Sequence, residues 1–128
     1  MRIINVFIPH RWNSNDYETI SSLLERTKFQ VKDSSVTKNE PLEKIDGRFL
    51  VDPQLKAKID WAGVIVCSNR PSNSNGIAIE EIKYALSKNK PVVAIQISNN
   101  TSTEIRNLNI PIIQNRKDSL ENWINNNK

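Results

Sequence analysis

The stretch of sequence that most constrains the fold runs from residue 64 to residue 84. It begins with a continuous apolar run, residues 64–67, which is typical of a strand covered on both faces of a sheet. Residues 68–76 are rich in Asn, Ser and Pro and therefore predict a loop. From Ile77 onward the apolar residues recur at helical spacing. A buried strand that leads through a loop into an amphipathic helix is typical of an α/β protein with a parallel sheet.

The same alternation continues over the 128 residues, so we expect a single domain spanning residues 1–128. Apolar runs predict strands at residues 3–8, 29–31, 64–67, 92–97 and 110–113. Start signals and periodicity predict helices that begin near residues 15, 53, 77 and 118. Residues 34–51 and 98–103 are interpreted as loops. Alternating strands and helices form right-handed crossovers, which predicts a flavodoxin-like three-layer sandwich with a five-stranded parallel sheet in the order 2-1-3-4-5.

Two helix starts carry specific signals. Asn15 can cap the first helix, with Glu18 three residues later at the spacing of a capping box. Asp52 and Pro53 combine an acidic cap with a proline at the first helical position. The Asn-rich residues 125–128 are expected to fray. The apolar positions of the last helix are expected to face the core: Leu120, Trp123 and Ile124.

Composition places few limits on function. The chain carries 18 Lys and Arg against 14 Asp and Glu, a net charge of +4, and the basic residues are scattered along it. This balance suits an anionic ligand such as a nucleotide, and the alternative is ordinary solubility charge. Cys67 is the only cysteine, so no intramolecular disulfide can form, and its apolar strand favours a buried thiol. Without a signal peptide or a run of about eighteen apolar residues, we expect a cytoplasmic protein that binds no membrane.

The predicted sheet selects two loops and one acidic residue as the candidate site. Ligands of such sheets bind at the carboxyl ends of the strands, where the strand order reverses, which selects the loops at residues 9–13 and 68–76. At 100° per residue, Glu81 falls at the border of the apolar stripe of its helix, half covered, whereas Glu80 faces solvent. The alternative is that both acids simply favour the positive end of the helix. The apolar stripe comprises Ala78, Ile79, Ile82, Ala85 and Leu86.

The two loops carry side chains that could hold a nucleotide. His10, Arg11 and Trp12 could stack on a base or ribose and contact a phosphate, although a lone histidine is usually structural and a tryptophan is often a packing anchor. Asn69 and Asn73 offer amide groups, and the backbone amides after Gly76 could bind a phosphate, but Asn is also an ordinary loop residue.

Several kinds of site are missing from the sequence. No Gly-rich phosphate loop follows the first strand, and no Cys or His cluster has metal-ligand spacing, so we expect no metal. No Gly-x-Ser-x-Gly nucleophile motif occurs. A phosphate-accepting receiver domain would need an aspartate at the end of the third strand, where Cys67 and Ser68 stand.

Four segments resemble the TIR-like domain of the bacterial Thoeris antiphage system, formerly a domain of unknown function. Residues 6–12, Val-Phe-Ile-Pro-His-Arg-Trp, are similar to the family's Val-Phe-Ile-Ser-His-x-Trp opening. Residues 29–36 resemble the end of the family's second strand. Residues 55–66 are similar to its Leu-x-x-x-Ile-x-x-(Ala/Ser)-Asp-hydrophobic pattern, which spans a helix and the strand after it. Residues 81–95 resemble, without a gap, its Glu-Ile-x-x-Ala segment that leads through Lys-Pro into an apolar strand. Together the segments span about residues 2–97.

The resemblance implies an enzyme that cleaves the nicotinamide–ribose bond of NAD and makes a cyclic ADP-ribose-type signal for a downstream effector. NAD is then the substrate, with no cofactor, and Glu81 is the catalytic glutamate. Two positions depart from the family: Pro9 replaces the usual serine, and Ile77 and Glu80 occupy a neighbourhood that often holds a tryptophan. The substrate-binding residues implied are Phe7, Pro9, His10, Arg11, Trp12, Ser35, Ser68, Asn69 and Asn73.

Three other functions are alternatives. TIR folds also act by self-association, so one alternative is a non-catalytic interaction module, and a homo-oligomer is compatible with either reading. An enzyme similar to nucleoside deoxyribosyltransferases would share the sheet and a glutamate but would favour nucleosides over NAD. A nucleic-acid binder is the least favoured, since the sequence has no long basic block.

Overall fold

The computed structural model describes residues 2–9, 15–33, 53–70 and 77–127. The described residues form five strands: β1 (Ile3–Phe7), β2 (Gln30–Asp33), β3 (Val64–Ser68), β4 (Val92–Gln96) and β5 (Ile112–Gln114). They also form five helices: α1 (Asp16–Glu25), α2 (Pro53–Trp61), α3 (Ile77–Ser87), α4 (Thr103–Asn107) and α5 (Lys117–Asn126). The strand bounds differ from the predicted ones by at most two residues at either end.

The sheet is parallel throughout and has the order β2-β1-β3-β4-β5. The predicted flavodoxin-like order is therefore confirmed. β1 and β3 are direct neighbours, with Val6 beside Val64 and Phe7 beside Ile65. From β1 the chain moves outward to β2, and from β3 it moves outward in the opposite direction to β4. The strand order therefore reverses between β1 and β3, and the loops that follow these two strands diverge there.

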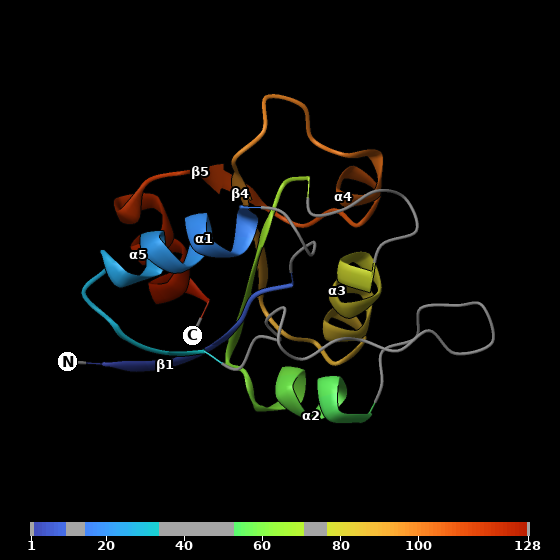
Figure 1. The fold of residues 1–128 in the computed structure, drawn as a ribbon, viewed down its shortest axis with the longest axis horizontal. Coiled ribbons are helices and arrows are strands. Elements are labelled where there is room, and N and C mark those ends of the chain that lie inside the picture. The colour runs from blue at the N-terminus through green and yellow to red at the C-terminus, as the bar shows by residue number, and fades with distance from the viewer. Residues whose placement is uncertain (1, 10–14, 34–52, 71–76, 128) are drawn as a thin grey trace.

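Helices cover both faces of the sheet. Figure 1 shows α1 and α5 on one side of it and α2 and α3 on the other. Each side has its own apolar core, one built on α1 and α5 and the other on α2, α3 and α4. In β3 the side chains alternate between the two cores: Val64 and Val66 face the first, and Ile65 and Cys67 face the second. Every residue of β3 is buried, which explains its continuous apolar sequence.

The apolar stripe predicted for α3 is confirmed. Ala78, Ile79, Ile82 and Ala85 are buried, and Leu86 is half-buried against the same core, which also contains Ile65 of β3. α3 follows β3 and runs back across the sheet, so its first turns lie at the carboxyl ends of the strands and its last turn lies at their amino ends.

Two predictions about helix ends were wrong. Asn15 precedes α1, but its side chain makes no capping hydrogen bond, because its φ of −90° and ψ of 6° are not the extended conformation that a capping side chain requires. Its backbone carbonyl instead accepts a hydrogen bond from the Thr19 amide at 3.0 Å. The Asn-rich end was predicted to fray from residue 125, but α5 continues to Asn126, and the Asn127 side chain donates to the Trp123 carbonyl at 2.8 Å.

The sequence analysis also missed α4. This helix has five residues and one buried apolar side chain, Ile105, so it shows no apolar periodicity. Its start is defined by Ser102, whose hydroxyl accepts a hydrogen bond from the Ile105 amide at 3.3 Å. The helix therefore begins inside the segment that was interpreted as the end of a polar loop.

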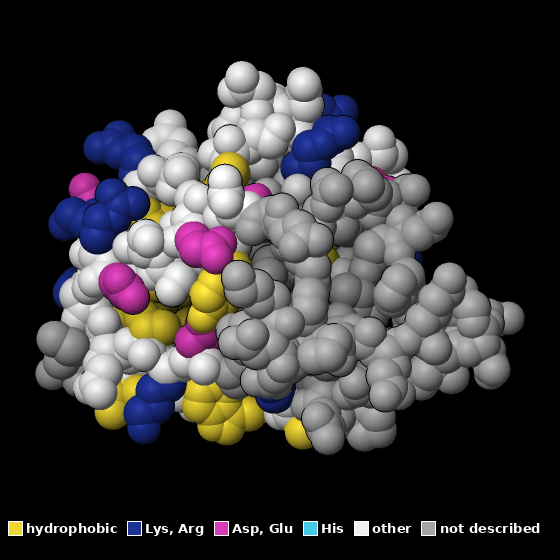
Figure 2. Space-filling view, viewed as in Figure 1, with side chains coloured by type: hydrophobic (Ala, Val, Ile, Leu, Met, Phe, Trp, Pro, Cys, Tyr) yellow, Lys and Arg dark blue, Asp and Glu magenta, His cyan; other side chains and the backbone are white. Residues whose placement is uncertain are grey.

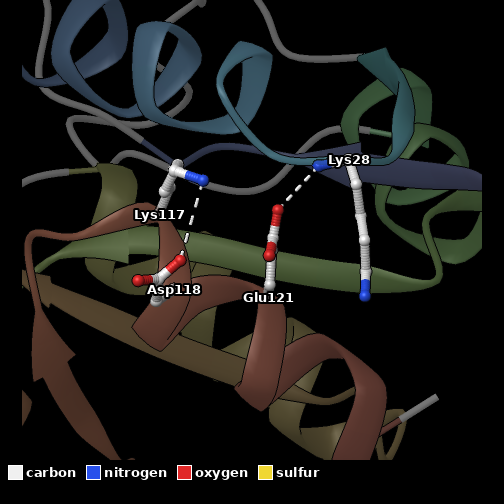
Figure 3. A network of polar contacts seen from close by, with 4 residues as sticks. All are labelled: Lys28, Lys117, Asp118 and Glu121. Carbon is white, nitrogen blue, oxygen red and sulfur yellow. Dashed lines mark hydrogen bonds and ion pairs between the residues drawn. The ribbon is translucent and has the colours of Figure 1, made fainter.

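Polar contacts hold α5 against the turn between α1 and β2. The Glu121 carboxylate accepts a hydrogen bond from the Lys28 backbone amide at 2.7 Å (Figure 3). A second contact in this view lies within α5 itself, where the Lys117 ammonium is 3.7 Å from the Asp118 carboxylate. Near the other end of α5, the Arg2 guanidinium donates to the Asn125 side-chain oxygen at 3.0 Å. α5 is thus attached by polar contacts as well as by its buried face. Within the described ranges, no helix is both long and apolar enough to cross a membrane.

Candidate active site

The candidate side chains gather at the edge of the sheet where its strands end. Because all the strands run in one direction, their carboxyl ends share this edge, and each following helix begins there. In sheets of this kind ligands bind outside this edge, where the strand order reverses. The described polar residues at the edge include Asp16 and Tyr17 of α1, Asp33 at the end of β2, Ser68 and Asn69 at the end of β3, and Glu81 of α3.

Glu81 is almost completely buried, at 3% exposure, in the second turn of α3. The prediction that it would be half covered was wrong. α3 packs against α2 as well as against the sheet, so the buried arc of the helix is wider than its apolar stripe. Glu80 points to solvent and pairs with Lys83 at 3.7 Å. Two adjacent acids therefore have opposite environments, and only the Glu81 carboxyl is shielded from water.

Ser68 and Asn69, at the end of β3, are also buried. The Ser68 hydroxyl accepts a hydrogen bond from the Arg70 amide at 2.9 Å, which turns the chain as it leaves the strand. The Asn69 side chain reaches across to the segment after β4. Its amide group donates to the Ser98 carbonyl at 2.8 Å and to the Thr101 hydroxyl at 3.1 Å. Its oxygen accepts from the amides of Ile97 and Ser98 at 3.1 and 3.0 Å.

The start of α1 adds a second group of polar residues to this edge. The Tyr17 hydroxyl donates to the Asp33 carboxylate at 2.6 Å, which joins α1 to the end of β2. Burial, followed by this bond to a negatively charged partner, raises the pKa of Tyr17. Burial also raises the pKa of the Cys67 thiol, and the Asp16 carboxylate raises it further.

Sequence reasoning overlooked Asp16, Tyr17 and Asp33 as residues of this edge. It considered Asn15 and Glu18 at the start of α1 and treated Asp33 only as the end of a strand. A usable signal was present, because an acidic residue in the first turn of a helix after a parallel strand lies at the ligand-binding edge by topology. The hydrogen bond between Tyr17 and Asp33 needed the three-dimensional structure.

The predicted site residues divide into described and undescribed ones. Phe7 is 1% exposed and packs in the core beneath α2 and α3, and Pro9, two residues further along the chain, is buried. The structure thus places the ends of β1 and β3 side by side and buries Glu81 in the helix that follows β3, while Glu80 faces solvent. The remaining predicted residues lie outside the described ranges: His10, Arg11, Trp12, Ser35 and Asn73.

The described part of the surface seen in Figure 2 shows no single concentration of positive charge. On that face the described Lys and Arg side chains lie in separate groups, with acidic and apolar side chains between them. Among the residues that the structure describes, no three His, Cys, Asp or Glu side chains lie together so that they could hold a metal ion. The Cys67 thiol is buried and donates to the Val93 carbonyl at 3.5 Å, which is a packing role.

Comparison with known families identifies the chain. The family model of the Thoeris protein ThsB, TIR-like domain, matches residues 7–102, about three quarters of the sequence. The chain belongs to this family. ThsB, the Thoeris protein that contains this TIR-like domain, belongs to antiphage defence. The resemblance that four segments of the sequence showed to this family is confirmed. No curated protein and no solved structure matches it.

The candidate site lies within the residues that the model of the ThsB TIR-like domain matches. The match runs from the end of β1 to the N-cap of α4 and includes all the predicted site residues. β5 and α5 lie outside the match. The part of the fold that the family model recognises is therefore the part that builds the carboxyl edge between β1 and β4.

Proposed function

We propose that this ThsB TIR-like domain cleaves the nicotinamide–ribose bond of NAD, with Glu81 as the catalytic carboxylate. The observation that carries the proposal is the burial of Glu81, at 3% exposure, in the second turn of α3 at the ligand-binding edge. A buried carboxylate costs free energy unless its surroundings compensate it, so an acidic residue in this position is a candidate for function. NAD is the substrate in this proposal, and no cofactor takes part.

The chemistry of NAD suits a site with one carboxylate. Glycosidases generally use one carboxyl group to protonate the leaving group and a second one at the anomeric carbon. Nicotinamide is cationic while it is attached to the ribose and departs as a neutral molecule, so the leaving group needs no proton. The Glu81 carboxylate would orient the ribose hydroxyls and stabilise the positive charge that develops on the ribose as the bond breaks.

The product in this proposal is a cyclic ADP-ribose-type nucleotide that a downstream effector senses. Cyclisation requires the ADP-ribosyl group to react with its own adenine before water reaches it. A buried carboxylate favours that outcome, because a site that excludes water suppresses hydrolysis of a reactive intermediate. His10, Arg11 and Trp12 are proposed to hold the rest of the dinucleotide.

The test compares Glu81→Gln with the matched variant Glu80→Gln. Both changes replace a carboxylate by an amide of the same shape on the same helix, one buried and one exposed. We expect Glu81→Gln to lower the rate of nicotinamide release by about 100-fold or more, the usual scale for one electrostatic stabiliser. Glu80→Gln should behave like wild type. Wild-type turnover by Glu81→Gln would contradict the assignment.

A non-catalytic interaction module is the second candidate, and one observation favours it. Pro9, where the family usually has serine, is buried at the end of β1, so it offers neither a hydroxyl nor a backbone N–H at that position. Calorimetry with NAD and mass analysis of nucleotides in cells with and without phage separate the two candidates. NAD binding with a phage-dependent nucleotide product supports the enzyme, and absence of both supports the module. A panel of nucleosides tests the deoxyribosyltransferase-like alternative.

A further inference from the structure

Asn69 has no hydrogen-bonding capacity left for a ligand. A side-chain amide can donate two hydrogen bonds and accept two through the lone pairs of its oxygen. Asn69 is 0% exposed, and all four positions are occupied by residues 97, 98 and 101. Its backbone is bound to β4 and to the segment that follows β4. The Asn69 amide donates to the Ile95 carbonyl at 2.9 Å, and the Asn69 carbonyl accepts from the Ser102 amide at 3.0 Å.

The arrangement also fixes which end of the side-chain amide faces which partner. Ser98 both donates its backbone N–H to the Asn69 oxygen and accepts, through its carbonyl, from the Asn69 nitrogen. Rotating the amide by 180° would place its NH₂ group against two backbone donors and its oxygen against a carbonyl. An aspartate has the same shape but would set a second oxygen against the Ser98 carbonyl, so only an asparagine completes this set of bonds.

The segment held by Asn69 leads into α4, which packs in the same core as α3, the helix that carries Glu81. Ser102, bound to the Asn69 carbonyl, is the N-cap of α4. The buried side chain of α4, Ile105, packs in the same core as Ile79 and Ile82 of α3. These two residues flank Glu81 in the sequence. A second contact also ties this segment to the end of β3, because the Arg70 guanidinium donates to the Asn100 carbonyl at 3.4 Å.

We infer that Asn69 is a positioning residue: it fixes the segment 97–102 against the end of β3 and, through α4, the position of α3 and its Glu81. The inference rests on the proposed function, in which Glu81 is the catalytic carboxylate. It assigns Asn69 an indirect role in place of the predicted direct contact with the substrate. A fully satisfied buried hydrogen-bond network makes its surroundings rigid. Rigid placement matters for catalysis, because an error of about 1 Å in a reacting group costs about 100-fold in rate.

The main test is Asn69→Asp, with Asn99→Asp as the matched control. Both variants make the same chemical change in or beside the same segment, but Asn99 is exposed. We expect Asn69→Asp to lower kcat for NAD cleavage about tenfold or more, with KM changed less than about threefold, because it misplaces the reacting groups and removes no substrate contact. Hydrogen exchange at the amides of Ile97 and Ser98 should accelerate at least about tenfold, because the second aspartate oxygen repels the Ser98 carbonyl and moves the segment away from the oxygen that binds both amides. Asn99→Asp should change neither quantity.

A second pair of variants covers the case in which Asn69→Asp does not fold. Thr101→Val removes one of the four bonds, and Thr103→Val is the exposed control two residues further on. We expect Thr101→Val to lower kcat about two- to tenfold, the range for one net hydrogen bond, and Thr103→Val to leave it unchanged.

The outcomes separate this inference from the proposed function. Wild-type kcat and KM in a folded Asn69→Asp variant, or a raised KM with an unchanged kcat, would overturn the positioning role, and the second result would indicate a direct substrate contact. If Asn69→Asp does not fold, an unchanged kcat in Thr101→Val overturns it. If the wild-type protein releases no nicotinamide under any condition, the proposed function fails, and only the structural part of the inference stands, that Asn69 fixes segment 97–102, which exchange at Ile97 and Ser98 decides. Unchanged exchange would overturn it.

Discussion

Glu80 and Glu81 show at the scale of single residues how position on a helix decides what a side chain can do. The two acids are chemically the same and adjacent, yet one pairs with Lys83 in water and the other is 3% exposed. An exposed carboxylate is screened by solvent, so its interactions are weak. A buried one acts through a lower effective dielectric constant, so the same charge has a larger effect on a nearby cation.

Tyr17 gives a prediction at this scale, because its hydroxyl donates to Asp33 and its pKa is raised. The folded state holds the tyrosine proton more tightly than the unfolded chain does. The stability that this provides is fully present below the ordinary tyrosine pKa of about 10 and is lost as the pH rises above it. Tyr17→Phe should cost about 1 kcal/mol at neutral pH, the usual net value of one hydrogen bond.

Urea unfolding at pH 7 and at pH 10.5 tests this prediction. Tyr17→Phe should lose less stability than wild type between the two pH values, because phenylalanine has no proton to release. Tyr84→Phe is a useful comparison, since the pKa of half-buried Tyr84 is also raised, by desolvation and by its bond to Asp60. An alkaline loss of stability in Tyr17→Phe equal to that of wild type would rule out the role of Tyr17.

At the scale of elements, Lys90 joins α2 to the start of β4. Its ammonium group donates to the carbonyls of Asp60 and Ala62 at 2.7 and 2.9 Å, at the C-terminal end of α2. The last carbonyls of a helix lack partners within the helix and carry partial negative charge, so a cation there is stabilising. The contact lies at the amino ends of the strands, opposite the candidate site.

We predict that Lys90→Met lowers the free energy of unfolding by about 1–3 kcal/mol, because two backbone carbonyls lose a charged donor. Lys88→Met is the control. Lys88 is exposed, and its ammonium lies 5.7 Å from the centre of the Tyr84 ring, a contact worth about 0.5–1 kcal/mol at an exposed site. Urea unfolding of both variants measures the difference, and equal stabilities would show that Lys90 does not stabilise the end of α2. Activity should be unaffected in either variant.

The elements also show how far the sequence predicts the structure. Apolar runs and helical periodicity were enough to locate the strands and the buried stripe of α3, because both follow from which residues leave water, and the strand order followed from the alternation of strands and helices. α4 was missed because five residues with one apolar side chain have no period. The burial of Glu81 was underestimated because a helical wheel does not include α2, the second surface against which α3 packs. The four bonds of Asn69 join segments 28 to 32 positions apart, which a local pattern cannot show.

At the scale of the whole molecule, the family match ends at residue 102 but the apolar core does not. Leu120, Trp123 and Ile124 of α5 are buried in the core that also contains residues of α1, β1 and β3. A protein of this size has room for little more than two such cores, so each large buried side chain is a substantial part of its stability. We therefore expect α5 to be required for the fold of the matched region.

The prediction compares two tryptophans of the same chain. Trp123 is 9% exposed and Trp61 is 44% exposed. Trp123→Ala should lower the free energy of unfolding by about 3–5 kcal/mol, because it leaves a cavity in the core. Trp61→Ala should cost less than about 1 kcal/mol, since most of its effect falls on surface contacts. Thermal and urea unfolding measure both, and a small effect of Trp123→Ala would show that α5 is an accessory to the fold.

The hydrogen bond between Arg2 and Asn125 brings the two ends of the described chain together at the amino ends of the strands (Figure 1). A purification handle or a fluorescent reporter attached at either terminus would therefore project away from the face that carries Glu81. The same proximity means that a short linker could join the two ends of the described chain and that new ends could be opened elsewhere, so this domain is well suited to circular permutation and to insertion into a surface loop of a host protein.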